Sequence, residues 1–157
     1  DVEAFWVPDD IDPVWHELSH GVGLCGGDFG LNHFDPRYFL ITGVPAPRTL
    51  TDPRVAVQAK VGESILIRYL NASYSVTSLV IDGLDAECVA ADGRPLDTRY
   101  SRPFTVPAGQ PLEATSAQRY DLIVKPERPG VYPARIEYRD WITGILRATA
   151  PTTITVT

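Results

Sequence analysis

The chain has 157 residues, a net charge of −6 and 44% hydrophobic residues, which is enough for one domain with a buried core. These values exclude a disordered tail, a collagen and a coiled coil. The acidic balance argues against nucleic acid as a partner. No apolar run approaches the ~20 residues that a membrane-spanning helix needs.

The chain contains no Met and begins with Asp1. We therefore expect a processed piece or an excised domain of a longer protein. The start Asp1-Val2-Glu3 is acidic, whereas a signal peptide begins with basic residues, so no signal peptide is expected in these residues.

Residues 1–37 are predicted to form a connector with little strand pattern. A short helix is expected over residues 13–20, because Asp12 suits the cap, Pro13 the first helical position and Gly21 the end. All three histidines of the chain also lie in this segment.

From residue 38 onward the sequence consists of short apolar and polar alternations that are separated by turn residues. Each alternating segment offers one apolar face, and two sheets are needed to hide such faces from water. Residues 38–157 are therefore predicted to form an all-β sandwich. The expected strands cover residues 38–41, 55–61, 64–70, 78–81, 87–91, 102–106, 120–124, 132–138 and 152–157.

The sharpest local motif is His16-Glu17-Leu18-Ser19-His20, which matches H-E-x-x-H. In zinc hydrolases two such histidines, one helical turn apart, bind zinc while the glutamate activates water. The longer form of the motif needs a third histidine where this chain has Gly26, and only fifteen residues precede the motif. The alternative interpretation is a polar connector helix with two surface imidazoles.

A second metal hypothesis joins His16, His20, Cys25 and His33, which are acceptable zinc or copper ligands within eighteen residues. Their spacing matches no metal module that we recognise. The alternative is a loop with an unpaired or packed thiol at Cys25.

The predicted sandwich lacks the donors of a blue-copper site, which needs two His, one Cys and usually an axial Met. Residues 34–157 contain no His, the chain has no Met, and Cys88 is the only thiol in that region. We therefore expect no complete type 1 copper site there and interpret Cys88 as a small buried hydrophobe. The sequence leaves a Cys25–Cys88 disulfide open.

Other catalytic signals are missing from the sequence. There is no G-x-S-x-G elbow and no phosphate-binding glycine loop. Acid pairs such as Asp82/Asp85 and Asp92/Asp97 fall at turns, where aspartate commonly bonds its own backbone. Asn71-Ala72-Ser73 is a glycosylation sequon, which matters only in a eukaryotic secretory setting. No catalytic, cofactor-binding or metal-binding residue is therefore assigned.

Several ordered blocks in residues 38–156 resemble the middle cupredoxin-like domain of a laccase-type, three-domain multicopper oxidase. The most specific block is Gln118-Arg119-Tyr120-Asp121, which is similar to the "Q-R-Y-D" strand of that family. The other matching blocks are residues 38–43, 61–72, 80–83, 90–95 and 130–135.

The resemblance implies an all-β, Greek-key β-sandwich of the cupredoxin type. It also implies a parent enzyme that oxidises phenol-like or metal substrates at copper and reduces dioxygen to water. In that family the copper ligands come from His-x-His pairs and a His-Cys-His segment in the first and third domains, and neither motif occurs here. The domain itself is therefore expected to hold no copper and to be inactive alone.

The resemblance further implies flanking cupredoxin domains of the parent chain as partners, no nucleic acid or membrane partner, and a secreted or periplasmic location. The family's pocket carboxylate before the "i-D-G" strand has no counterpart in residues 71–81, and Leu84 stands where the family has a histidine. Two alternatives stay open: an extracellular binding or adhesion sandwich, and a zinc hydrolase that uses His16, Glu17 and His20.

Overall fold

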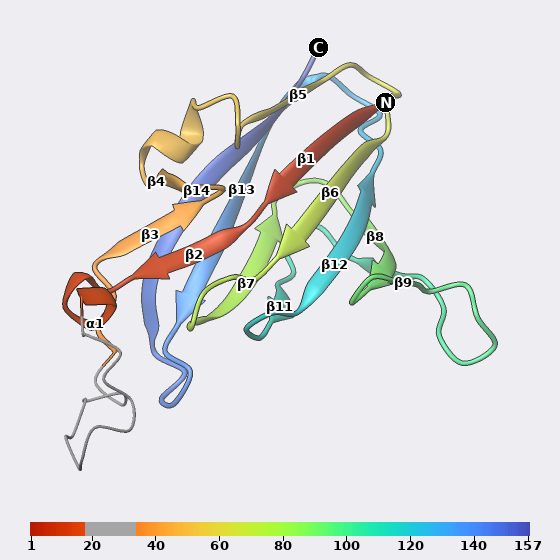
Figure 1. Ribbon diagram of the computed structural model, residues 1–157. Coiled ribbons are helices and arrows are strands. Elements are labelled where there is room, and N and C mark those ends of the chain that lie inside the picture. Colours follow the sequence, from red (N-terminus) through yellow and green to blue (C-terminus); the bar gives the residue numbers. More distant parts are fainter. Residues whose placement is uncertain (18–33) are drawn as a thin grey trace.

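A computed structural model describes residues 1–17 and 34–157. The described chain is a sandwich of two β-sheets with a smaller third sheet beside it (Figure 1). In the two larger sheets most neighbouring strands are not consecutive in sequence, as in a Greek key. The prediction of an all-β, Greek-key β-sandwich of the cupredoxin type is confirmed.

The first sheet shows the alternating burial that is typical of strands. In β6 (Ile65–Leu70), Ile65, Ile67 and Tyr69 are buried. Their neighbours in sequence face outward, as the two-residue period of a strand requires. The strand order is β1 (Val2–Trp6), β6 (Ile65–Leu70), β12 (Arg119–Val124), β8 (Ala86–Ala91) and β10 (Phe104–Val106), with β9 (Arg94–Pro95) paired to β8.

The second sheet is built around a long hairpin. Ala134, Ile136 and Tyr138 point into the core, and the alternate residues carry ion pairs on the outer face, such as Arg139 to Glu137 at 2.8 Å. The strand order is β11 (Leu112–Ala114), β7 (Val76–Ile81), β13 (Gly130–Arg139), β14 (Leu146–Val156) and β5 (Val57–Ala59).

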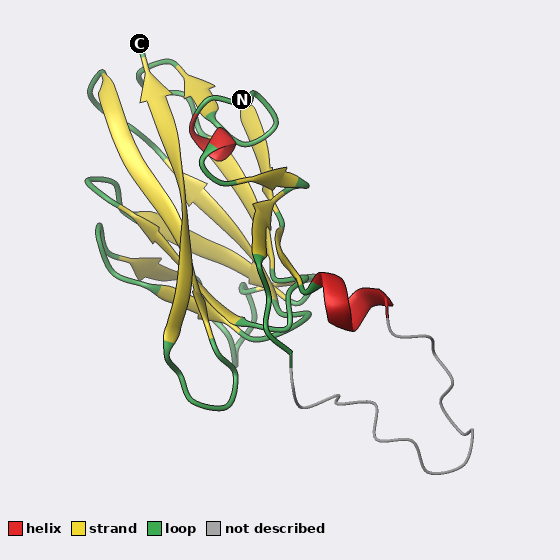
Figure 2. Ribbon diagram, turned by 90° about the vertical axis from the view of Figure 1, so that its left-hand side faces the viewer, coloured by secondary structure: helices red, strands yellow, loops and turns green. Residues whose placement is uncertain are grey.

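The smaller sheet lies at one side of the sandwich and closes it (Figure 2). Its strands are β2 (Pro8–Ile11), β3 (Tyr38–Ile41) and β4 (Val44–Pro45), which is followed by the 3₁₀-helix η1 (Arg48–Leu50). The backbone N–H of Thr42 donates to Val7 O at 2.8 Å, which joins this sheet to the end of β1. Helix α1 (Pro13–Glu17) follows β2.

One continuous apolar core fills the space between the sheets. The largest side chains that are almost completely buried come from strands of all three sheets: Trp6, Tyr69, Tyr138, Ile41, Ile65, Ile67, Leu79, Leu122, Ile136 and Ile154. No helix in residues 1–17 or 34–157 is long and apolar enough to cross a membrane.

The expectation of a connector over residues 1–37 is wrong for its first part. Residues 2–6 form β1, which runs parallel to β6 in the first sheet, and residues 8–11 form β2. The physical reason lies in Trp6, whose ring is fully buried and whose Nε1–H donates to Val55 O at 2.9 Å. The helix expected over 13–20 is present over 13–17, and residues 18–20 lie outside the described residues.

Candidate functional site

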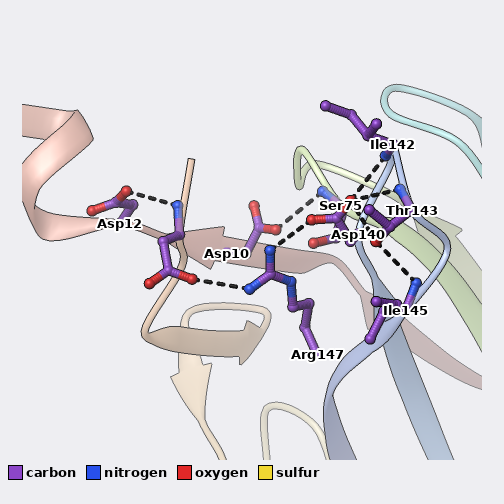
Figure 3. Close-up of polar contacts among 9 residues, drawn as sticks. Asp10, Asp12, Ser75, Asp140, Ile142, Thr143, Ile145 and Arg147 are labelled. Atoms are coloured by element: carbon purple, nitrogen blue, oxygen red, sulfur yellow. Dashed lines mark hydrogen bonds and ion pairs between the residues drawn. The ribbon is translucent and has the colours of Figure 1, made fainter. Parts of the chain in front are cut away.

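Polar side chains from four segments meet at the end of the sandwich that carries α1 (Figure 3). We call Asp10, Asp12, Asp35, Asp140 and Arg147 the end network. Figures 1 and 3 show that α1, the β6–β7 connection and the tip of the β13–β14 hairpin lie at this end, whereas both termini lie at the opposite end.

Asp10 holds the β6–β7 connection against β2. Its carboxylate is 1% exposed and accepts the backbone N–H groups of Tyr74, at 2.9 Å, and Ser75, at 3.0 Å. A buried carboxylate is tolerated where backbone donors satisfy it. Asp10 therefore fixes the position of a loop and has no oxygen facing open solvent.

Asp12 joins the two ends of the segment that contains α1. One carboxylate oxygen accepts the N–H groups of Val14 and Trp15, at 2.9 and 3.2 Å, and so caps the helix. The other oxygen accepts the N–H of Asp35 at 2.9 Å, and this bond is the main reason that the pKa of Asp12 is lowered. The expectation that Asp12 caps this helix is confirmed.

Removing the Asp12 carboxylate should weaken this end at neutral pH. We expect Asp12→Ala to cost about 1 kcal/mol, as for other helix caps. Because the folded pKa is lowered, the charged form stabilises the fold above the unfolded value near 3.8. That contribution is lost as the pH falls through the folded pKa. Urea unfolding at pH 7 and at pH 3 should therefore show a difference from the unchanged protein that shrinks on acidification.

The exposed Asp97, which also stands in a turn region, provides the control. Asp97→Ala should change the free energy of unfolding by less than about 0.5 kcal/mol at either pH. Equal effects of the two substitutions at pH 7 would contradict the role assigned to Asp12.

Arg147 connects the hairpin to the segment after residue 33. Its guanidinium donates to Asp140 at 2.7 Å and to Asp35 at 3.0 Å. The ion pair with Arg147 is the main reason that the pKa of Asp140 lies far below its usual range. Arg147 therefore ties together two segments more than one hundred residues apart in sequence.

Asp140 also orders the turn that follows it. Its carboxylate accepts the N–H groups of Ile142 and Thr143, at 3.0 and 2.8 Å. Its main chain exchanges two bonds with the turn: the N–H donates to Ile145 O and the C=O accepts the N–H of Gly144. Gly144 has φ +70°, a conformation that glycine adopts without strain.

The end network is built to hold loops in place. Each of its carboxylates accepts backbone N–H groups or an Arg147 donor, so none stands free as a general base or nucleophile. Within the two described ranges, no group of three or more His, Cys, Asp and Glu residues is arranged to hold a metal ion. The sequence reasoning missed Asp140 and Arg147, although aspartate and glycine, which both occur in residues 140–144, are common turn residues.

Of the predicted connector ligands, the structure describes His16 alone. His16 is exposed, and its Nδ1 lies 2.8 Å from Asp12 O. His20, Cys25 and His33 lie outside the described residues, as does the geometry of the H-E-x-x-H motif. The hypotheses of a zinc hydrolase and of a four-ligand metal site in this segment stay predictions.

Cys88 lies in the middle of the first sheet, in β8, between Leu122 of β12 and Phe104 of β10. Its side chain is fully buried, its Sγ lies 3.5 Å from Ala90 O, and burial raises the pKa of the thiol to about 11. A copper ligand must be a thiolate, and a blue-copper site adds two imidazoles. Cys88 therefore does not fit a type 1 site, and Cys25, its only possible disulfide partner in the chain, is not among the described residues.

The layered sheets, the Greek-key order and the apolar core define a Greek-key β-sandwich. No family model and no curated protein matches the sequence. Solved structures of multicopper oxidases do match, over 99% or more of this chain.

Three of these structures show the range of the likeness. Blue copper oxidase from Nitrosomonas europaea has a TM-score of 0.69 and 20% identity, over 99% of this chain and 44% of that one. Fet3p, a multicopper oxidase that functions in iron import, has a TM-score of 0.67 and 16% identity, over 99% of this chain and 28% of that one. A copper-containing nitrite reductase from Thermus scotoductus SA-01 has a TM-score of 0.61 and 14% identity, over 99% of this chain and 31% of that one.

At these identities the likeness establishes the fold, which is the cupredoxin-like fold of multicopper oxidase domains. The chain spans less than half the length of each of these multicopper oxidases.

Proposed function

We propose that this chain is a copper-free structural domain, in the middle position, of a laccase-like multicopper oxidase. The parent enzyme would oxidise phenol-like or metal substrates and reduce dioxygen to water. Copper bound by other domains would supply the electron transfer and the oxygen chemistry. The residues of this chain would supply a rigid spacer between those domains.

The observation that carries this proposal is the combination of the fold with the donor set. The fold matches multicopper oxidases over nearly the whole chain. Yet residues 34–157 offer no imidazole and no thioether, and the Cys88 thiol is buried and protonated at neutral pH. A sandwich of this kind can have a structural role in a copper enzyme, but it lacks the ligands of an electron-transfer copper.

The middle position and the substrate class rest on the resemblance of residues 38–156 to the second domain of laccase-type enzymes. The block Gln118-Arg119-Tyr120-Asp121 supports it most, because its last three residues begin β12, the central strand of the first sheet. Asp121 accepts from Arg68 at 3.1 Å, and the N–H of Arg119 donates to Asp92 at 3.0 Å. The block therefore has a structural role in this fold.

The test uses the complete polypeptide encoded by the reading frame that contains this chain. We expect the purified protein to hold several copper ions per chain and to consume oxygen with a methoxyphenol or with ferrous iron as reductant. A Cys88→Ala variant of that polypeptide should keep its full copper content. A complete polypeptide without copper, or the loss of one copper ion from the variant, would contradict the proposal.

A further inference from the structure

Four large apolar side chains are exposed on the hairpin tip, which we define as residues 141–146, from the turn after β13 to the first residue of β14. Trp141 is 53% exposed, Ile142 65%, Ile145 64% and Leu146 46%. The six residues of the tip include no charged side chain. Clustered apolar exposure of this kind marks an interaction surface, whereas apolar residues scattered singly over a surface do not.

The hairpin tip is held in one conformation before any partner arrives. Asp140 accepts the N–H groups of Ile142 and Thr143 and pairs with Arg147, which is itself paired with Asp35 (Figure 3). A surface that is already ordered loses little conformational entropy on binding. The end network thus presents the tip as a preorganised apolar contact.

The charges around the hairpin tip favour a protein partner over a lipid surface. A loop that inserts into a membrane surface combines apolar side chains with free cationic side chains. Here the two flanking cations are already paired, Arg139 with Glu137 and Arg147 with Asp140 and Asp35. The chain also carries a net charge of −6.

The size of the hairpin tip favours a tethered partner over a second copy of this chain. One aromatic and three aliphatic side chains are each about half exposed, so the tip offers on the order of a few hundred Å² of apolar surface. A stable complex of two free proteins buries about 800 Å² on each partner. A domain in the same polypeptide needs less area, because tethering gives it a high effective concentration.

From these observations, and resting on the proposed function, we propose that the hairpin tip docks against a neighbouring domain of the same parent polypeptide. The neighbour would receive Trp141, Ile142 and Ile145 in an apolar depression. Both termini lie at the end of the sandwich opposite the tip (Figure 1). Strand β13 has ten residues, so it spans about 33 Å between these ends. The docked domain would therefore lie alongside the sandwich.

The experiment places a photo-crosslinking phenylalanine analogue at position 145 of the complete polypeptide, and in a second preparation at position 131. Val131 is a matched control, since it lies on the same hairpin, is also 64% exposed, and stands at the far end of β13. We expect position 145 to form crosslinks within the same molecule to residues outside this chain, in at least tenfold higher yield than position 131.

The paired substitutions Ile145→Asp and Val131→Asp give a second measurement on the same polypeptide. We expect Ile145→Asp to accelerate proteolysis between the domains roughly tenfold, as loss of a central contact does, while Val131→Asp changes it less than twofold. Crosslinks confined to this chain, crosslinks between molecules, or equal effects of the two substitutions would overturn the inference. Copper content and oxygen consumption, measured on the same preparations, report separately on the proposed function.

Discussion

Replacing Trp6 with alanine should destabilise the protein by about 3–5 kcal/mol, which is the usual cost of truncating a buried aromatic side chain. Trp6 is fully buried between the sheets and is the largest side chain in the core. The substitution also leaves the carbonyl of Val55 without its donor, the Trp6 Nε1–H at 2.9 Å. Because whole domains are stable by only about 5–15 kcal/mol, the effect is large. Urea unfolding at pH 7 measures it directly.

The neighbouring residue Phe5 provides the matched control, since it belongs to the same strand but is 49% exposed on the outer face. Its ring meets Arg68, whose Cζ lies 6.0 Å from the ring centre. We expect Phe5→Ala to cost less than about 1 kcal/mol. Similar losses for Trp6→Ala and Phe5→Ala would mean that residues 2–6 do not pack into the sandwich as a strand.

Replacing Asn71 with alanine should cost about 2–4 kcal/mol, because its side-chain amide is fully buried and uses all its bonding positions. Its Nδ2–H₂ donates to Ser75 O and to Ala114 O, both at 2.9 Å. Its Oδ1 accepts from the Ser73 N–H at 3.0 Å and the Ser73 hydroxyl at 2.6 Å. The substitution leaves two buried carbonyls and two donors to find new partners. Thermal and urea unfolding both report the loss.

Ser73→Ala distinguishes the loss of the Asn71 amide from the loss of the sequon. It also destroys the sequon Asn71-Ala72-Ser73, but both hydrogen bonds that the Asn71 amide donates remain in place. We expect a smaller loss, about 1–2 kcal/mol. For the same structural reason, folded protein secreted from a eukaryotic host should carry no glycan at Asn71. A glycan detected by mass spectrometry on folded protein, or a loss below about 0.5 kcal/mol for Asn71→Ala, would refute this view of the site.

The strands with regular alternation could be predicted from sequence because the period of two fixes which side chains are buried. Residues 38–41 agree with β3 at both ends, and residues 64–70 and 120–124 agree with β6 and β12 to within one residue. In the expected strand 55–61 only residues 57–59 pair, since Gly62 and the turns around it end the ladder.

The strands at the start of the chain could not be predicted, because their sequence mixes signals. In β1 the inward positions are Ala4 and Trp6, and the outward positions include Phe5, so alternation is obscured. In β2 the sequence alone indicates that Asp10 is a solvent-exposed charge. Its burial is explained only by the backbone N–H groups of the β6–β7 connection, which donate to its carboxylate in the folded structure. These partners are about 65 residues away, and a local pattern does not contain them.

The same limit applies to the end network and to Asn71. Arg147 meets Asp35 across more than one hundred residues, so the sequence shows two unrelated charges. Asn71 satisfies a sequon, and its sequence neighbours give no indication that a β-sandwich encloses it. By contrast, the expectation that residues 34–157 hold no type 1 copper needs no structure, because that segment contains no histidine and the chain contains no methionine.

The central proposal is that this sandwich carries no copper inside an enzyme that does. Anomalous X-ray scattering at the copper absorption edge, measured on crystals of the complete polypeptide, tests it most directly because it locates every copper atom. We expect copper peaks in the rest of the polypeptide and none coordinated by residues 34–157. A copper peak bound by Cys88, or by any other side chain of those residues, would contradict the proposal.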